Sequence, residues 1–480
     1  MKGDVLMTIE RQVAKGVICG LAIAGLTVAA QAADLSEVVK APPKLPDTLT
    51  WNGITLYGAL DVGYAYSNNA APIGNYFAGV NANVFASPPG RGPISTINTQ
   101  GYSFVGLRIE EPLGYDWKAI GRIETGFDPL TGQINDGCKT LVDNNGKPNS
   151  QQTTSGDSNQ CGGLTRQVWV GVSNKTYGQL QIGRNNSLAA DSIWGFDPVV
   201  IADFSAILWG LGFTAGTGAT ETTRWNNSAK YVYTNDFLHA GVMFAQGQHQ
   251  GSSLHGDSYA ANFGFNWQGL YVDAVYTAER DAVRSGLFGV GGCGVAGTPS
   301  CGTLSVTGQN TDAWALMGKY AYDFTAGAKG APLNRLTFYA GYQNITYSNP
   351  SDPLSIGDTT VGGYMFGAVN NTAYSFDHKR VGFAWIGAKY ELGGWAVSAA
   401  YYRAMQGYYQ GNATATPCST NAHSYCSGSW ETASLSAVYS FDKHWDVYGG
   451  VVWSKLNGGF SAGYDDPETT TFLTGVILRF

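Results

Sequence analysis

The chain of 480 residues carries few charges for its length and is rich in glycine and aromatic residues. Glycine accounts for 65 residues, aromatic residues for 13% and charged residues for 13%, and the net charge is −7. The aromatic content excludes a disordered chain, and the irregular spacing of the glycines excludes a collagen-like one. The acidic balance and the lack of a basic cluster exclude a nucleic-acid-binding protein.

The N-terminus has the pattern of a secretory signal peptide, to which we assign residues 1–32. Arg11 and Lys15 precede an apolar run at 16–30, and residues 30–32 read Ala-Gln-Ala, an A-x-A cleavage site. No other run approaches the ~18 apolar residues that a membrane helix needs. We therefore expect an exported protein whose membrane spans, if it has them, are the strands of a closed barrel.

Residues 33–50 contain three prolines, at positions 42, 43 and 46. Proline lacks a backbone donor and favours extended, unpaired chain. We interpret this segment as a periplasmic lead into the following domain, and a tether to the cell wall is the alternative.

The segment 444–454 shows the strand pattern most clearly. One face carries only apolar residues with a tryptophan at each end (Trp445 and Trp453), and the other face is mostly polar. Eight residues span about 27 Å, which a tilt of ~40° reduces to roughly 21 Å, close to the ~25 Å apolar band of an outer-membrane barrel. The segment therefore predicts a lipid-facing strand between two aromatic girdles.

Sixteen segments from Trp51 onward have strand periodicity, and sixteen is an even number, as in bacterial outer-membrane barrels. Short turns such as Asn235-Asp236 alternate with long loops such as 128–164 and 185–223. A β-propeller would instead repeat about every 40 residues. We predict an all-β fold for residues 51–480, a 16-stranded antiparallel transmembrane β-barrel. Its strands are expected at 54–66, 101–111, 115–127, 165–173, 178–184, 224–235, 238–248, 256–267, 270–280, 310–324, 333–347, 378–391, 394–408, 429–441, 444–455 and 469–480.

Six cysteines remain once Cys19 is removed with the signal peptide, and they form three local pairs. Each pair falls within one predicted long loop, and none has the C-x-x-C spacing of many zinc sites. An exported chain with such pairs favours disulfides over free or metal-bound thiols. The predicted disulfides are Cys138–Cys161, Cys293–Cys301 and Cys418–Cys426, and we expect no metal and no cofactor.

Several stretches, in order along the chain, resemble the Gram-negative general porins, a family of trimeric 16-stranded porins. They are 54–63, 105–114, 118–127, 166–171, 178–184 and the terminal 476–480, whereas the loops 67–100 and 128–164 do not obviously align. The resemblance implies a homotrimer in the lipid and lipopolysaccharide of the outer membrane of a Gram-negative bacterium, passing ions and small hydrophilic solutes. Small residues expected on the outer face, Gly58, Ala59 and Gly121, are compatible with close contact between protomers.

The segment 185–223 corresponds to the family's inward-folded third loop. It carries Asp191, Asp197, Asp203 and Glu221 but no lysine or arginine, and its apolar run at 204–213 would be costly on a solvated surface. We expect it to fold against the inner wall with its carboxylates toward the lumen. An outer loop that leans on the membrane is the alternative.

Charged residues on the facing wall complete the predicted constriction. Strand parity places Asp61, Arg122 and Glu124 inward, and the resemblance assigns Arg166 and Arg224 to a basic ladder opposite the loop. Opposed charges of this kind filter solutes through a transverse field. An ion pair at the rim is the alternative role for the last two arginines.

The basic side of this constriction is thinner than in relatives, which often carry an arginine where this chain has Phe104. We therefore predict weak cation selectivity.

The sequence as a whole indicates a passive diffusion porin without catalytic chemistry. A substrate-selective barrel, such as a carbohydrate porin with a continuous aromatic track, is the main alternative. An outer-membrane hydrolase and an adhesin are weaker alternatives, and no Ser–His–acid constellation for the hydrolase can be assembled. The run 289–294 matches G-x-G-x-x-G only formally, since no buried strand precedes it and no helix follows it.

Overall fold

The computed structural model describes residues 48–70, 92–98, 103–130, 132–134, 164, 166–199, 204–209, 224–247, 257–280, 285–288, 304–306, 310–326, 331–349, 360–361, 364–365, 374, 376–410, 418, 425–460 and 468–480. The chain divides into a unit of residues 1–47 and a unit of residues 48–480, and only the second is described. The predicted signal peptide and nearly all of the proline-rich lead therefore lie outside the described residues.

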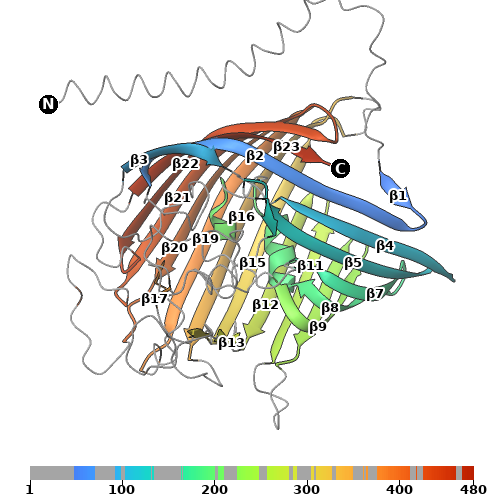
Figure 1. Ribbon diagram of the computed structural model, residues 1–480, viewed down its shortest axis with the longest axis horizontal. Helices are drawn as coiled ribbons and strands as arrows, with labels where there is room; N and C mark the ends of the chain where they lie inside the picture. The colour runs from blue at the N-terminus through green and yellow to red at the C-terminus, as the bar shows by residue number, and fades with distance from the viewer. Residues whose placement is uncertain are drawn as a thin grey trace, which may run out of the picture. The chain divides into compact units, whose positions relative to one another are not determined.

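The described residues form a closed barrel of sixteen long antiparallel strands (Figure 1). The first and last strands close it, with Asp61 opposite Ile477. The strands are β2 (Ile54–Ala70), β4 (Phe104–Gly114), β5 (Trp117–Asp128), β7 (Val168–Asn174), β8 (Gly178–Asn186), β9 (Arg224–Thr234), β10 (Leu238–Ala245), β11 (Ser258–Trp267), β12 (Leu270–Glu279), β15 (Asn310–Asp323), β16 (Asn334–Ser348), β19 (Lys379–Leu392), β20 (Trp395–Gln406), β21 (Gly428–Ser440), β22 (Trp445–Gly458) and β23 (Glu468–Arg479).

Each of the sixteen predicted segments corresponds to one of these strands, and the predicted fold class is confirmed. The alternation explains the agreement, because side chains on a strand point in turn to the two faces of the sheet. On β22, Trp445 is 44% exposed on the outer face, whereas Asp446, Tyr448 and Ser454 are buried inside. One expectation for the outer face was wrong: Ala59 is buried on the inner face, since it has the parity of the inward Asp61.

Several short strands lie outside the sixteen predicted segments, where the sequence pattern predicted no strand. β3 (Gly92–Asn98) lies in the predicted loop 67–100 and pairs with the second half of β2, beyond the part that β4 covers. It satisfies backbone groups of β2 that would otherwise lack partners there. The others are β1 (Leu49–Trp51), which pairs with the start of β2, β6 (Gln133–Ile134), and the pairs β13 (Ser285–Phe288) with β14 (Leu304–Val306) and β17 (Thr360–Val361) with β18 (Tyr364–Met365).

The tight turns lie at one end of the barrel, and their central residues have positive φ. Gln268 and Gly269 join β11 to β12 with φ of 48° and 85°, and Tyr115 and Asp116 join β4 to β5 with φ of 52° and 62°. Positive φ at both central positions is typical of type I′ turns, whose twist matches the flanking strands. Among the described residues, no helix has the length and hydropathy to cross a membrane.

Candidate pore constriction

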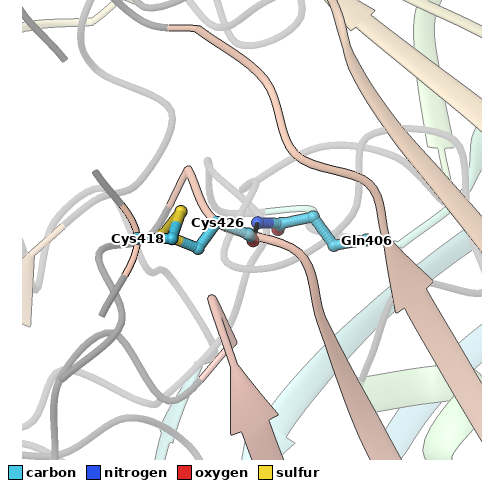
Figure 2. The surroundings of a disulfide bond; sticks show 3 residues. All are labelled: Gln406, Cys418 and Cys426. Carbon is cyan, nitrogen blue, oxygen red and sulfur yellow. Dashed lines mark hydrogen bonds between the residues drawn. A yellow bond between two sulfur atoms is a disulfide. The ribbon is translucent and has the colours of Figure 1, made fainter. Parts of the chain in front are cut away.

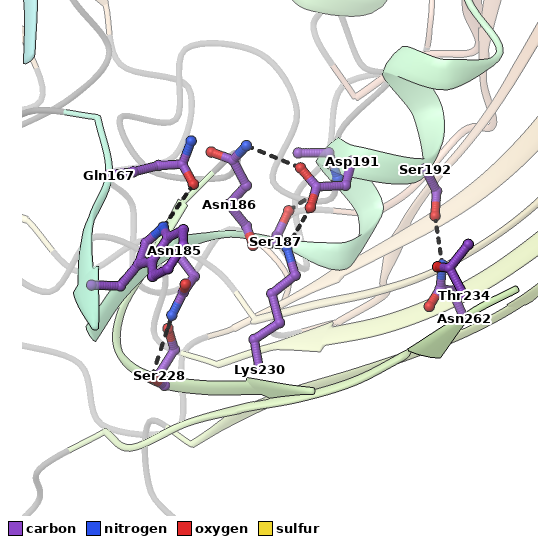
Figure 3. Close-up of polar contacts among 12 residues, drawn as sticks. Gln167, Asn185, Asn186, Ser187, Asp191, Ser192, Ser228, Lys230, Thr234 and Asn262 are labelled. Atoms are coloured by element: carbon purple, nitrogen blue, oxygen red, sulfur yellow. Dashed lines mark hydrogen bonds and ion pairs between the residues drawn. The ribbon is translucent and has the colours of Figure 1, made fainter. Parts of the chain in front are cut away.

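Helix α3 (Leu188–Gly195) follows β8 directly and lies inside the barrel, against β10, β11 and β12 (Figure 1). Ser187 is its N-cap, since the Ser187 side chain accepts a hydrogen bond of 3.1 Å from the amide of Ala190. The amide of Asn262, on the inner face of β11, donates to the Ser192 hydroxyl at 3.0 Å (Figure 3). The cap thus turns the chain inward as soon as β8 ends.

Two lysines of the wall hold the ends of α3. Near its start, Lys230 of β9 forms an ion pair with Asp191, whose side chain is 44% exposed, and donates to the carbonyl of Asn186 at 3.1 Å (Figure 3). At its end, Lys319 of β15 donates to the carbonyl of Gly195 at 2.7 Å and lies over the ring of Phe196 at 5.2 Å. A cation near the last carbonyls stabilises a helix C-terminus.

The chain beyond α3 continues along the wall toward β22. The hydroxyl of Tyr402 (β20) donates to the Asp197 carboxylate at 2.7 Å, and the hydroxyl of Ser205 donates to its other oxygen at 2.5 Å. The indole of Trp385 (β19) donates to the carbonyl of Phe196 at 3.0 Å. These wall residues are buried, whereas Ile386, the neighbour of Trp385, is 62% exposed on the outer face.

The second described part of the segment, 204–209, contains the short helix α4 (Ala206–Trp209). The ring of Phe204 packs edge-on against Tyr448 of β22, with centroids 6.3 Å apart. We call the residues 187–199 and 204–209 the inner segment. The contacts described above with the wall reach from β9 round to β22, along its inner face.

Glycines of the wall lie where the inner segment approaches most closely. A Cβ on Gly387 would lie 2.6 Å from the ring of Pro198, and one on Gly450 would lie 2.8 Å from the ring of Phe204. A Cβ on Gly241 would meet the Leu188 side chain at 3.0 Å. Side chains at these positions would push the inner segment off the wall, and their absence permits its close packing.

A second cluster, on β2, β4, β5 and the chain before β7, combines an acid with arginines. Glu124 is buried, forms an ion pair with Arg166, and accepts a hydrogen bond of 2.8 Å from the Tyr57 hydroxyl. The Arg166 guanidinium lies over the ring of Phe104 at 4.5 Å. Arg122 lies between rings, 5.7 Å from that of Tyr57. Phe104 occupies the position where relatives often carry an arginine, and here its ring stacks against the guanidinium of Arg166.

Of the remaining predicted site residues, one lies in the second cluster, one lies beside the inner segment, and two lie outside the described residues. Arg224, at the start of β9, is buried and interacts electrostatically with Glu124. Asp61 is 1% exposed and accepts a hydrogen bond of 2.7 Å from Tyr448, the residue against which Phe204 packs. Asp203 and Glu221 lie outside the described residues. The sequence interpretation missed Lys230 and Lys319, although strand parity alone would have placed both inward.

One predicted disulfide is present near the outer ends of β20 and β21. Cys418 and Cys426 are joined, with a Cα–Cα distance of 5.8 Å, and the side chain of Gln406 donates to the carbonyl of Cys426 at 2.8 Å (Figure 2). The other two predicted pairs, Cys138–Cys161 and Cys293–Cys301, lie outside the described residues. No group of three or more metal-ligating side chains occurs within the described ranges.

The model of one protein family, described as Gram-negative porin, matches residues 20–459. The chain belongs to this family. This porin is 27% identical to an outer membrane porin protein of Bordetella pertussis over 179 residues, which are 37% of this chain and 38% of the relative. Membership of this family places the protein in the outer membrane.

Solved porins share the barrel at low sequence identity. An anion-selective porin from Comamonas acidovorans is similar with a TM-score of 0.54 and 15% identity, over 89% of this chain and 99% of that one. In-vitro folded OmpT of Vibrio cholerae is similar with a TM-score of 0.51 and 14% identity, over 91% and 100% of the two chains. At such identities the likeness establishes the fold alone.

Proposed function

We propose that this porin forms a water-filled channel for the passive diffusion of ions and small hydrophilic solutes across the outer membrane. The observation that carries the proposal is the attachment of the inner segment along the inner wall from β9 to β22. A barrel of sixteen strands is wide enough to enclose an aqueous channel, and a segment folded inside it narrows that channel. Membership of the porin family supports the same function.

In the proposed constriction, the inner segment supplies carboxylates, and the wall cluster of Arg122, Glu124, Arg166 and Arg224 supplies guanidinium groups. Guanidinium groups stay ionised at any relevant pH. The transverse electric field between the carboxylates of the inner segment and the arginines of the wall therefore persists. Such a field orders water and disfavours bulky apolar solutes. Asp191, with its half-exposed side chain, is the carboxylate best placed to act on passing ions.

We propose weak cation selectivity for this constriction. The acidic inner segment favours cations, while Lys230 and Lys319 bring positive charge to the same segment and keep the preference small.

We also propose that the porin assembles as a homotrimer in lipid and lipopolysaccharide. One solved structure of OmpT from Vibrio cholerae is of a trimer form, and that chain has the fold of this one. Gly58 on β2 and Gly121 on β5 have outward strand parity, with β4 between the two strands. The ring of Phe480 covers Gly58, where a Cβ would lie 2.6 Å from it, whereas the lack of a side chain at Gly121 is compatible with close approach of a second protomer.

Single-channel recording in a planar bilayer tests the channel function. The purified protein should give stepwise, ohmic conductance without an energy source, and the current should not saturate with neutral sugars. Conductance blocked at low concentration by one carbohydrate would favour a substrate-selective porin. A protein that inserts but never conducts would contradict the channel and favour an adhesin, and ester hydrolysis would reveal an enzyme.

A further inference from the structure

Side chains of the inner wall form a hydrogen-bonded network next to helix α3. The amide nitrogen of Asn262 (β11) lies 2.7 Å from Nε2 of His239 (β10), and it donates to the hydroxyl of Ser192 on α3 at 3.0 Å (Figure 3). It also approaches a carboxylate oxygen of Asp273 (β12), at 3.4 Å. The other ring nitrogen of His239, Nδ1, lies 2.9 Å from the hydroxyl of Thr234 (β9). We call these five residues the histidine network.

The register of the wall brings the histidine network together around a glycine. His239 is opposite Thr234 on one side and opposite Gly264 (β11) on the other, and Gly264 is in turn opposite Asp273. A Cβ on Gly264 would lie 3.2 Å from a carboxylate oxygen of Asp273. The missing side chain leaves the space across which His239 and Asp273 interact electrostatically.

The donors of the network fix the form of the imidazole that it accommodates. Because the amide nitrogen of Asn262 faces Nε2, that ring nitrogen is the acceptor, and the ring proton lies on Nδ1 and is donated to Thr234. Within the described part of the chain, neither the carbonyl oxygen of Asn262 nor Oδ1 of Asp273 has a hydrogen-bond partner, and both are buried. Two buried acceptors are therefore left over beside a ring nitrogen that is itself an acceptor.

Proton binding to His239 reverses this balance. Both ring nitrogens of an imidazolium are donors, so the Nε2–H group would face the N–H group of Asn262. Turning the amide over removes the conflict, because its carbonyl oxygen then accepts from Nε2. In the structure, the Ser192 hydroxyl accepts from Asn262 and donates to Asp273. After the turn it must donate to Asn262 instead, and helix α3 loses its hydrogen bond to Asp273.

Asp273 is the charged group that faces His239 from the neighbouring strands. Tyr271, on the same face two residues earlier, lies under the ammonium group of Lys319 at 5.1 Å. The remaining charged residues of β9–β12, α3 and the turn before β10 lie in an ion pair of their own, in the exposed turn, or at the long-loop ends of their strands: Lys230 with Asp191, then Asp236, then Arg224 and Glu279. The charge of His239 therefore acts chiefly on Asp273.

We infer that His239 and Asn262 are positioning residues for the constriction, and that they couple proton binding in the lumen to the attachment of helix α3. With a neutral ring, the amide of Asn262 points toward Ser192, and α3 is fixed to both β11 and β12. When His239 takes up a proton, the amide turns over and α3 keeps one hydrogen bond fewer. Histidine suits this role because its charge changes between about pH 5 and pH 8. His239 is only partly buried, so protons reach it from the lumen.

This inference rests on the proposed channel function, and single-channel recording of the full mature protein from pH 8 to pH 5 tests it. In the wild type, the time spent in the main open level relative to sublevels should fall about fivefold over this range, because α3 loses one hydrogen bond. His239→Gln should flatten this pH profile, since a glutamine oxygen accepts from Asn262 at every pH. Ser192→Ala should also flatten it, because α3 then has no hydroxyl to exchange.

His444→Gln is the matched control, because His444 is also partly buried at the short-turn end, with one ring nitrogen 2.8 Å from the carbonyl oxygen of Arg479. It should keep the wild-type profile. Nitrogen-15 spectra of protein labelled in its histidines give a second readout that needs no conductance. At pH 8 they should show the ring proton of His239 on Nδ1, in a signal assigned by its loss in His239→Gln.

A ring proton on Nε2 at pH 8, or a pH profile that survives His239→Gln, would overturn the inference. A profile that His239→Gln flattens and Ser192→Ala leaves intact would also overturn it, because His239 would then act on ions through its charge and not through α3. If His239→Gln does not fold, the profile of Ser192→Ala decides. A protein that never conducts would instead overturn the channel function, and this inference with it.

Discussion

At the level of single residues, the two described carboxylates of the inner segment have different surroundings. Asp191 is paired with Lys230 and remains half exposed. Asp197 is enclosed by the hydroxyls of Tyr402 and Ser205, and burial raises the pKa of its carboxyl in spite of these donors. A raised pKa means that the attachment of the inner segment to the wall through Asp197 is most favourable at low pH, and that it loses stability as the pH rises through the folded-state pKa. Asp197 therefore anchors the segment, and we expect Asp191 to be the carboxylate that acts on ions.

This difference predicts unequal effects of two conservative substitutions on charge selectivity. Asp191→Asn should shift the reversal potential toward anions by several millivolts, because it leaves Lys230 uncompensated near the lumen. Asp197→Asn should shift it less, because a neutral amide oxygen accepts the same hydrogen bonds. Reversal potentials under a KCl gradient at pH 7 measure both, and the shifts should shrink as salt screens the field. A larger effect of Asp197→Asn would contradict these roles, and a wild-type potential of anion-selective sign would contradict the cation preference.

The wall cluster predicts the opposite shift when an arginine is removed. Arg166→Ala should strengthen the cation preference and raise the conductance, because it removes bulk and leaves the Glu124 carboxylate without its ion pair. Arg335→Ala is the matched control, since Arg335 is an inward arginine paired with Glu391 at 2.8 Å near the short turns. Recordings in which both variants behave alike would show that the cluster is not the narrow part of the pore.

At the level of elements, helix α3 depends on wall lysines at both ends. Lys319→Met removes a charged hydrogen bond to the last turn, an interaction worth on the order of 2 kcal/mol. We expect a looser helix, visible as increased noise and subconductance levels in the open channel. Lys389→Met is the control, because Lys389 is inward on β19 and forms its ion pair with Glu391 on the same strand, at 3.5 Å. Equal noise in both variants would argue against the anchoring role.

The cysteine pairs belong to the same level, because each predicted bridge would close one long loop. The bridge Cys418–Cys426 spans a separation of 8 residues, so it should order its loop more than it stabilises the barrel. Peptide mapping without reductant should find it, together with Cys138–Cys161 and Cys293–Cys301. Free thiols, or bridges between different loops, would show that the loop assignment is wrong.

For the whole molecule, we expect crosslinking and native mass measurement to give a trimer, and conductance to appear in groups of three equal steps. Replacing an outer-face glycine by a larger residue, as in Gly121→Leu, should weaken the trimer, because it places a side chain where we expect protomers to meet. Val170→Leu is the control on a neighbouring strand, because Val170 is already a large exposed residue of the outer face. A monomer with single unit steps in the wild type would contradict the assembly.

The sequence by itself determined the barrel, because strand alternation is a local property that each segment carries independently. Two tryptophans eight residues apart were enough to orient β22, and the same rule placed Asp61, Arg122 and Glu124 inward. Parity fails only where it is misapplied, as at Ala59, since neighbours on a strand cannot share a face. The strand β3 escaped prediction because its pairing depends on how far β4 extends along β2.

Only the tertiary structure decided which charges meet. Lys230, Lys319 and Asp191 lie on separate elements, and no local pattern links them. The same holds for the stacking of Arg166 on Phe104. Contacts between residues distant in the chain depend on strand register and on the path of the inner segment. Both are set by the closure of the whole barrel, so the pairing of its charges could not be read from any single strand.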